Sequence, residues 1–192
     1  MSIEAAKNWR DYLWEATRKT RTLLFSTDVS GRSVRDTMDR LLALEADDAE
    51  RPITLLLNTP GGSVSDGYAL VDMLRFIQSP VRVVGMGVVA SMGISILLSV
   101  EKPYRVCLPN TRFMLHQPRF LGTVTGQVSD LEITASEMVK MKNKSNEEVA
   151  AGTGQPLAKV EKDTRRDLWL TADEALEYGL ISRIIQSATE LD

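Results

Sequence analysis

The 192-residue sequence contains one cysteine, Cys107, and one histidine, His116. A single thiol excludes an intrachain disulfide and a thiolate-cluster metal site, and one imidazole cannot supply the usual zinc ligand set. We therefore expect no resident metal. A lone cysteine in an apolar strand is most often a core residue, and this cysteine usage is typical of a reducing compartment, so we expect a cytoplasmic protein.

Basic runs and nucleotide-binding motifs are also missing. The 23 lysines and arginines are outnumbered by 26 acidic residues, which gives a net charge of −3. That balance leaves no excess of positive charge that would attract nucleic acid, so we expect no nucleic-acid partner. The G-x-x-x-x-G-K-[ST] motif does not occur. We therefore expect no ATP site and no cofactor in this chain.

Long apolar runs are scarce. Charges at Glu4 and Lys7 interrupt the start of the chain, which leaves no apolar core for a signal peptide. One window, residues 83–100, has 18 consecutive uncharged residues, the minimum for a membrane span. Three glycines and three serines dilute it, and Arg82 and Glu101 flank it. A buried strand that leads into a buried helix is favoured over a span, and no membrane association is expected.

The hydrophobic periodicity alternates between strands and helices. We expect helices at about 4–18, 33–49, 65–77, from 91 onward, 125–150, 157–165 and 172–178, and strands at 21–27, 52–58, 81–86, 104–116 and 181–185. This alternation predicts an α/β fold with largely parallel strands in one domain over residues 1–192. The helix at 125–150 is polar on most of its circumference, which is typical of an arm outside the globule.

Ser91 stands where the strand-like segment 81–86 and its glycines meet the next helix. Small neighbours such as Ala90 and Gly93 permit a tight turn there, and a helix N-terminus supplies free N–H groups. Both features suit a nucleophile. The alternative is a serine that only caps the helix.

His116 is the one side chain whose ordinary titration range suits a general base for a serine. The alternative is a structural hydrogen-bonding role beside Pro118. Gly61 and Gly62 follow a buried strand, where their amides can face a cleft as an oxyanion site or simply form a tight turn. Spacing does not identify a third catalytic group among 26 acids, and Asp163 and Asp167 both remain open.

Five segments in sequence order resemble the proteolytic subunit of the Clp protease, ClpP, over about residues 21–186. They are NTPGGSV at 58–64, GMGVVASMG at 85–93, CLPNTRFMLHQP at 107–118, GTGQ at 152–155 and DTRRDLWLTADEALEYGLI at 163–181. The resemblance implies a ClpP/crotonase-like fold of repeated β-β-α units. It also implies an N-terminal helix at about 1–20 and a protruding handle at about 119–152.

The same resemblance implies a serine endopeptidase that hydrolyses unfolded polypeptides into short peptides through an acyl-enzyme. Ser91 would be the nucleophile, His116 the general base and acid, and Asp167 the residue that orients the imidazole. The N–H groups of Gly62 and Met92 would stabilise the oxyanion.

The resemblance further implies seven-membered rings of this chain stacked as a double ring, and a separate AAA+ unfoldase of the ClpX or ClpA/ClpC type that uses the ATP. Thr54, Leu56 and Val106 stand where the family usually has aromatic residues that receive the unfoldase. Arg165 replaces an acidic residue of the ring-to-ring contact. From these departures we hypothesise a divergent paralogue that forms mixed barrels with a second ClpP-type subunit, and the alternative is a barrel of this chain alone.

Two other functions are alternatives to this one. The first is a structural or regulatory ring subunit with little activity alone, and the second is a crotonase-like acyl-CoA enzyme. The intact set of Ser91, His116 and Asp167 argues against the first. The second would leave the segments around Ser91 and His116 unexplained.

Overall fold

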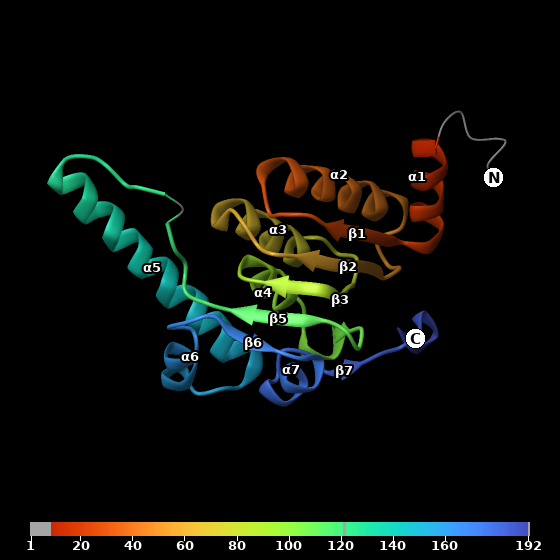
Figure 1. The fold of residues 1–192 in the computed structure, drawn as a ribbon. Coiled ribbons are helices and arrows are strands. Elements are labelled where there is room, and N and C mark those ends of the chain that lie inside the picture. Colours follow the sequence, from red (N-terminus) through yellow and green to blue (C-terminus); the bar gives the residue numbers. More distant parts are fainter. Residues whose placement is uncertain (1–8, 121, 192) are drawn as a thin grey trace.

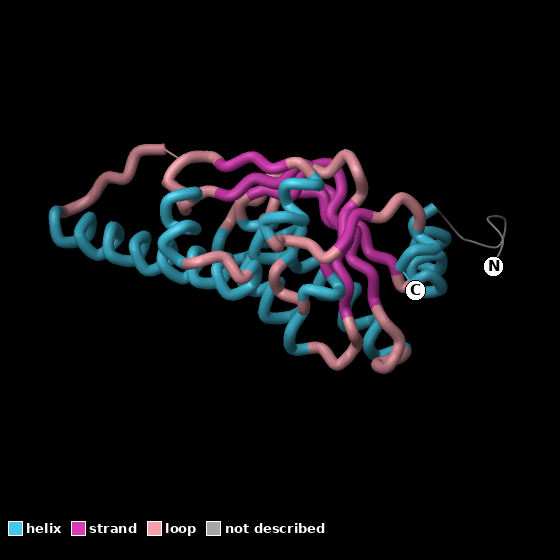
Figure 2. The backbone as a smooth tube through the Cα atoms, turned by 90° about the horizontal axis from the view of Figure 1, so that it is seen from below, coloured by secondary structure: helices cyan, strands magenta, loops and turns pink. Residues whose placement is uncertain are grey.

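The computed structural model describes residues 9–120 and 122–191, which form a central sheet with most helices on one side (Figures 1 and 2). The helices are α1 (Trp9–Thr20), α2 (Gly31–Asp47), α3 (Val64–Phe76), α4 (Met92–Leu97), α5 (Val128–Thr153), α6 (Leu157–Asp163) and α7 (Ala172–Tyr178). The strands are β1 (Thr22–Ser26), β2 (Ile53–Thr59), β3 (Val81–Ala90), β4 (Arg105–Cys107), β5 (Arg112–Leu115), β6 (Leu168–Leu170) and β7 (Arg183–Ile184). Short 3-10 turns cover Lys102–Tyr104 and Ala188–Leu191.

The sheet has seven strands, and five of them follow the order β1-β2-β3-β4-β7, all parallel. Strand β5 also pairs parallel with β3, and β6 pairs antiparallel with β5. Each parallel crossover carries a helix that packs back on the sheet, as such connections require. The predicted α/β fold with largely parallel strands is confirmed.

Strand β2 shows how the core is divided by the sheet. Its burial alternates strictly, with Ile53, Leu55 and Leu57 fully buried in the main core. The intervening Leu56 lies on the other face, in a smaller cluster around Val84, Val106 and Ile185, against which Leu191 near the C-terminus also packs. The apolar run at 52–58 therefore reflects one deeply buried face and one half-covered face.

Strand β3 is longer than expected and ends at Ala90 rather than at residue 86. It continues because Gly87 adopts φ +59°, a left-handed conformation that redirects the strand beside Asn58. The Asn58 Oδ1 accepts a hydrogen bond from the Val88 N–H at 3.0 Å. The first half of β3 pairs with β4 and the second half pairs with β5.

The single strand region expected at 104–116 is wrong, since the structure has two strands there, β4 and β5. A turn separates them, in which Thr111 donates from its N–H and its hydroxyl to the Leu108 carbonyl, at 3.1 and 2.7 Å. Pro109 lies in this turn and has no N–H for a ladder. Strand β6 was missed, because three residues are too few for a periodic signal.

The uncharged window at 83–100 forms the strand β3 and the six-residue helix α4, as favoured from the sequence. In the described ranges, no helix is both long enough and apolar enough to cross a membrane.

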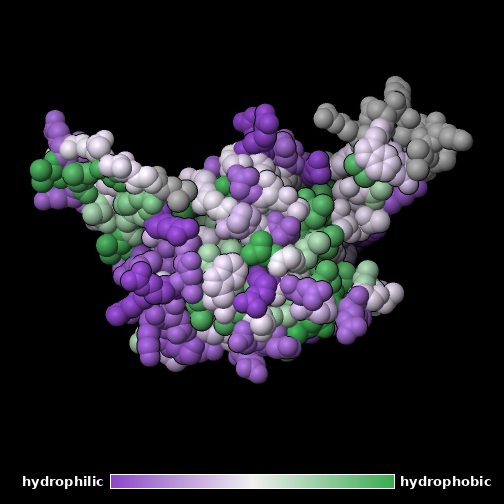
Figure 3. All heavy atoms as spheres, in the orientation of Figure 1, coloured by the Kyte–Doolittle hydropathy of each residue, from purple (hydrophilic) through white to green (hydrophobic). Residues whose placement is uncertain are grey.

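Helix α5 projects away from the sheet as an arm (left side of Figure 1). It starts three residues later than expected and ends at Gly154, whose φ is +80°. Its buried residues, Asn146, Val149 and Thr153, all belong to its C-terminal part. The free part exposes apolar side chains such as Val128 and Ile133, and hydrophobic spheres gather at the end of the arm in Figure 3. Of the expected N-terminal helix, residues 1–8 lie outside the described residues.

Candidate active site

The candidate residues lie where neighbouring strands end at one edge of the sheet. In the parallel pair β3–β5, Ala90 is opposite Met114, so Ser91 and His116 follow at the same edge. In the antiparallel pair β5–β6, Leu115 is opposite Leu168. Asp167 precedes β6 and therefore lies beside His116. The crevice outside the carboxyl ends of parallel strands is the usual ligand site of α/β sheets.

Ser91 occupies a sharp turn between β3 and α4. Its backbone has φ +55° and ψ −121°, an unusual conformation for a residue other than glycine. The Ser91 N–H donates to the Met114 carbonyl at 2.9 Å, which fixes the turn on β5. The side chain makes no helix-capping hydrogen bond, so the capping interpretation is wrong. Its Oγ instead lies 2.8 Å from the His116 Nε2.

His116 contacts both other candidates. Its side chain is 9% exposed, and its Nδ1 lies 3.3 Å from the Asp167 Oδ1. An ionised carboxylate only accepts hydrogen bonds, so Nδ1 donates to Asp167 and Nε2 is left to accept from the Ser91 hydroxyl. The segment is held in place by the Gln117 N–H, which donates to the Thr164 carbonyl at 3.0 Å.

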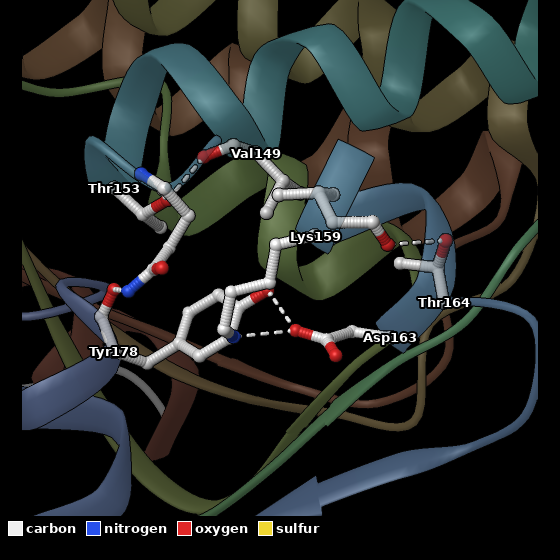
Figure 4. Close-up of polar contacts among 8 residues, drawn as sticks. Val149, Thr153, Lys159, Asp163, Thr164 and Tyr178 are labelled. Atoms are coloured by element: carbon white, nitrogen blue, oxygen red, sulfur yellow. Dashed lines mark hydrogen bonds and ion pairs between the residues drawn. The ribbon is translucent and has the colours of Figure 1, made fainter. Parts of the chain in front are cut away.

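The structure distinguishes between Asp163 and Asp167, the two alternatives for the third catalytic group. The Asp163 Oδ2 accepts from the Lys159 Nζ at 2.6 Å and from the Tyr178 hydroxyl at 3.0 Å, and Figure 4 shows Asp163 turned toward both. Burial, and next the hydrogen bond to Asp163, raises the pKa of Tyr178. Asp163 is thus engaged at α6 and α7, whereas Asp167 faces the imidazole. The Asp167 side chain is 50% exposed.

The glycine loop after β2 lies directly against the Ser91 turn. Gly61 and Gly62 have φ of +92° and +152°, and a Cβ added to Gly61 would lie 3.0 Å from the Met92 nitrogen. The loop is anchored by Val29, whose N–H donates to the Gly61 carbonyl and whose carbonyl accepts from the Ser63 N–H. Within the described residues, the Gly62 and Met92 N–H groups donate no hydrogen bond. Two unused amides near a nucleophile are what an oxyanion site requires.

A small pocket of about 40 Å³ opens beside the Ser91 hydroxyl. Its lining combines the candidate residues with side chains from α3, α4 and the arm helix α5: Val64, Tyr68, Ser91, Met92, Ser95, His116, Pro118, Met141 and Ser145. Two larger hollows lie along α2 and contain none of the candidate catalytic residues. Among the residues that the structure describes, no group of three or more His, Cys, Asp or Glu could hold a metal ion.

Three comparisons with known proteins agree with one another. The family model described as Clp protease matches residues 5–188. The chain is 46% identical over 173 residues to ATP-dependent Clp protease proteolytic subunit 2 of Gluconobacter oxydans, which covers 89% of this chain and 76% of that protein. It is 42% identical over 173 residues to ATP-dependent Clp protease proteolytic subunit 2 of Treponema pallidum, covering 90% and 86%. A solved mutant of ClpP1 from Listeria monocytogenes is similar with a TM-score of 0.86 and 39% identity, covering 94% of this chain and 99% of that one.

Proposed function

The chain belongs to the Clp protease family, and from that membership we propose that it is a serine endopeptidase subunit that hydrolyses unfolded polypeptides into short peptides. One observation carries the proposal, which is the 2.8 Å distance from the Ser91 Oγ to the His116 Nε2. A hydroxyl this close to an imidazole can lose its proton as it attacks a carbonyl.

The reaction proceeds in two halves. The Ser91 Oγ attacks the carbonyl carbon of a peptide bond while His116 takes the hydroxyl proton, and Asp167 stabilises the resulting imidazolium. The N–H groups of Gly62 and Met92 donate to the oxyanion. His116 then returns the proton to the leaving amine and an acyl-enzyme remains on Ser91. A water molecule, deprotonated by His116, attacks the ester and releases the acid and the free Ser91 hydroxyl.

For the assembly, we propose seven-membered rings stacked as a double ring that works with a separate AAA+ unfoldase. The names of the relatives describe them as proteolytic subunits of ATP-dependent proteases, and the exposed apolar side chains on the arm helix α5 suit self-association. Arg165 and Arg166 are both exposed beside Asp167. The resemblance to ClpP implies a ring-to-ring contact there, in which stacked copies of this chain would bring like charges together. A second ClpP-type subunit would relieve that repulsion.

One observation favours a second candidate, a regulatory ring subunit with little activity alone. The contact between His116 and Asp167 is 3.3 Å long and Asp167 is half-exposed, so this pair is weaker than the one between Ser91 and His116. Catalytic hydrogen bonds often shorten only when the substrate or a partner is bound. Activity therefore has to be measured both for the chain alone and for its assemblies.

A fluorophosphonate probe tests the proposal because it reacts with an activated serine and not with an ordinary one. We expect labelling of the purified chain at Ser91, confirmed by peptide mass spectrometry, and its loss in Ser91→Ala. The matched control is Ser99→Ala, since Ser99 follows the same short helix and its hydroxyl donates to the Ile96 carbonyl. If no assembly state is labelled, with or without a second ClpP-type subunit, the regulatory candidate is correct instead.

A further inference from the structure

Asn58, the last residue but one of β2, lies beside a bulge in the strand that leads to the candidate nucleophile. Figure 1 shows β1, β2 and β3 side by side, and they pair in that order. The register of β2 and β3 shifts between Leu57, which is opposite Gly85, and Thr59, which is opposite Val89. Two steps along β2 thus correspond to four steps along β3, so β3 contains two additional residues at this point.

The side chain of Asn58 fills the interruption that the bulge makes in the ladder. Its Oδ1 accepts a hydrogen bond from the Val88 N–H at 3.0 Å, so a side-chain amide takes the place of a main-chain carbonyl. A backbone N–H can only donate, and this fixes the orientation of the amide. The Nδ2 then faces β1, where it donates to the Ser26 Oγ at 2.9 Å. One side chain therefore joins three strands.

Gly87 supplies the backbone conformation that the bulge requires. It is exposed and has φ +59°, in the region that favours glycine. A Cβ added there would lie 2.7 Å from the Asn58 Oδ1, so the amide packs directly against the Gly87 backbone. The bulge thus depends on a glycine that can adopt the turn and on an amide that satisfies the N–H which follows it.

The bulge determines where Ser91 lies along the sheet. Beyond the bulge, β3 pairs with β5, with Ala90 opposite Met114, and the Ser91 N–H donates to the Met114 carbonyl at 2.9 Å. Two residues of a strand span about 7 Å, so without the bulge Ser91 would be displaced by about that distance. The displacement exceeds the 2.8 Å between the Ser91 Oγ and the His116 Nε2, and the two groups would separate.

Thr59, the neighbour of Asn58, connects the same strand end to the rest of the site. It is fully buried, and its Oγ1 accepts from the Gly61 N–H at 3.1 Å. A Cβ added to Gly93 on α4 would lie 2.6 Å from the Thr59 Cγ2, so α4 packs closely on this residue. A shift of β2 against β3 would therefore also move the glycine loop relative to the Ser91 turn.

We propose that Asn58 is a positioning residue, whose side-chain amide fixes the register of β3 and so holds the Ser91 hydroxyl within hydrogen-bond distance of His116. This inference rests on the proposed function, because it takes Ser91 as the nucleophile. Asn58 is not among the residues that line the pocket beside Ser91, and it acts through β3. Its replacement should therefore change the chemical step and not the binding of the substrate.

The test compares Asn58→Leu with Asn58→Asp, each in the active assembly and with a fluorogenic peptide as substrate. Leucine has a similar size and no acceptor. Aspartate keeps an oxygen for the Val88 N–H and can accept from the Ser26 hydroxyl, which can donate as well as accept.

We expect Asn58→Leu to lower kcat and the rate of fluorophosphonate labelling at least tenfold, with KM within about threefold of the unmodified chain. Asn58→Asp should keep kcat within about threefold. A crystal structure of Asn58→Leu should show the Ser91 Oγ more than about 3.5 Å from the His116 Nε2, beyond hydrogen-bond distance.

The matched control for lost stability is Ser79→Ala. Ser79 is buried just before β3, at the opposite end of that strand, and its Oγ accepts from the Arg21 Nη2 at 3.2 Å. This variant loses a buried hydrogen bond as Asn58→Leu does, so it should lower the melting temperature and leave kcat unchanged.

A second variant makes the test independent of whether Asn58→Leu folds. Gly87→Ala is an exposed change that places a methyl group against the Asn58 amide, and it should lower kcat at least tenfold. Gly154→Ala is its control, since it has the same left-handed strain and no atom within 4 Å of the added Cβ. It should retain kcat.

The two proposals fail in different ways. If the fluorophosphonate labels Ser91 but folded Asn58→Leu keeps its kcat, or Asn58→Asp loses as much as Asn58→Leu, the role of Asn58 is wrong and the hydrolase stands. Equal kcat in Gly87→Ala and Gly154→Ala overturns that role as well. If no assembly of the unmodified chain is labelled or cleaves any peptide, the hydrolase itself is wrong, and the inference about Asn58 is overturned with it.

Discussion

Gly61 touches Ser91 so closely that a Cβ added to the glycine would lie 2.6 Å from the Cβ of the serine. It would also lie 2.8 Å from the Ala90 carbonyl oxygen. Real Cβ atoms do not approach other atoms this closely, so the glycine loop and the nucleophile turn fit together only because position 61 has no side chain. The arrangement couples the loop amides to the position of the Ser91 hydroxyl.

Replacement of this glycine should therefore damage the site more than the fold. In Gly61→Ala, the new methyl group meets backbone and Cβ atoms that cannot rotate away, so the two segments must separate. We expect at least a hundredfold loss of kcat/KM and of fluorophosphonate labelling. The control is Gly154→Ala, which imposes the same left-handed strain at φ +80° but has no atom within 4 Å of the added Cβ. It should cost about 1 kcal/mol of folding free energy and leave activity unchanged. Equal losses in both variants would contradict this account.

The two acids near β6 provide a matched pair of variants. Asp167→Asn keeps the size of the side chain but removes the charge that stabilises the His116 imidazolium, and we expect kcat to fall by about 10²–10⁴-fold. Asp163→Asn loses the charge pair with Lys159 and keeps an oxygen for Tyr178, so it should lower the melting temperature slightly and leave kcat within about twofold. Steady-state kinetics on both variants decide the assignment. The reverse pattern would show that Asp163, and not Asp167, stabilises the His116 imidazolium.

Local signals explain why some elements could be predicted accurately from sequence. The prediction of a helix at 172–178 is confirmed by α7. Its ends are marked by residues whose effect depends only on their neighbours in the sequence. Thr171 and Glu174 form a reciprocal capping box, and Gly179 takes the left-handed conformation at the other end with φ +94°. Helix α5 also ends at a left-handed glycine. Such features require only neighbours in sequence, so a single sequence reveals them.

The pairing that completes the site is not local, so composition and spacing could not predict it, and only the resemblance to ClpP implied Asp167. Ser91 and His116 stand out by residue type and position, since the chain has one histidine. The choice of Asp167 depends on the antiparallel pairing of β5 with the three-residue strand β6, more than 50 positions away in the chain. Neither the composition nor the spacing carries that information. The pocket beside Ser91 also depends on contacts between distant segments, such as the hydrogen bond from the Tyr68 hydroxyl on α3 to the Glu148 Oε2 on α5.

The root of the arm helix is tied to the catalytic segment by a buried polar pair. The Asn146 Oδ1 accepts from the Thr164 hydroxyl at 3.0 Å, and the Thr164 carbonyl accepts from the Gln117 N–H next to His116. Asn146→Ala should cost about 1–3 kcal/mol of folding free energy, because a buried hydrogen bond is lost. Asn143→Ala, on an exposed position of the same helix, should stay within about 0.5 kcal/mol. Urea denaturation of both variants measures the difference. Equal midpoints would show that the pair contributes nothing.

The thiol of Cys107 should not react with alkylating reagents in the folded protein. It is fully buried in β4, and burial raises the pKa of its thiol from 9.0 to about 11, with a smaller contribution from Asp173. The neutral thiol is not the nucleophile, so iodoacetamide at pH 7.5 should leave the folded chain unmodified and add one group in guanidinium chloride. The sequence has no other cysteine, so a single mass shift reports the result, and Cys107→Ala should show none.

The raised pKa of the Cys107 thiol also determines how the stability of the protein depends on pH. Because the unfolded thiol ionises first, this residue should lower stability as pH rises from about 9 through about 11, and it should have no effect below that range. Modification of the folded chain as fast as the unfolded one would show that β4 opens readily.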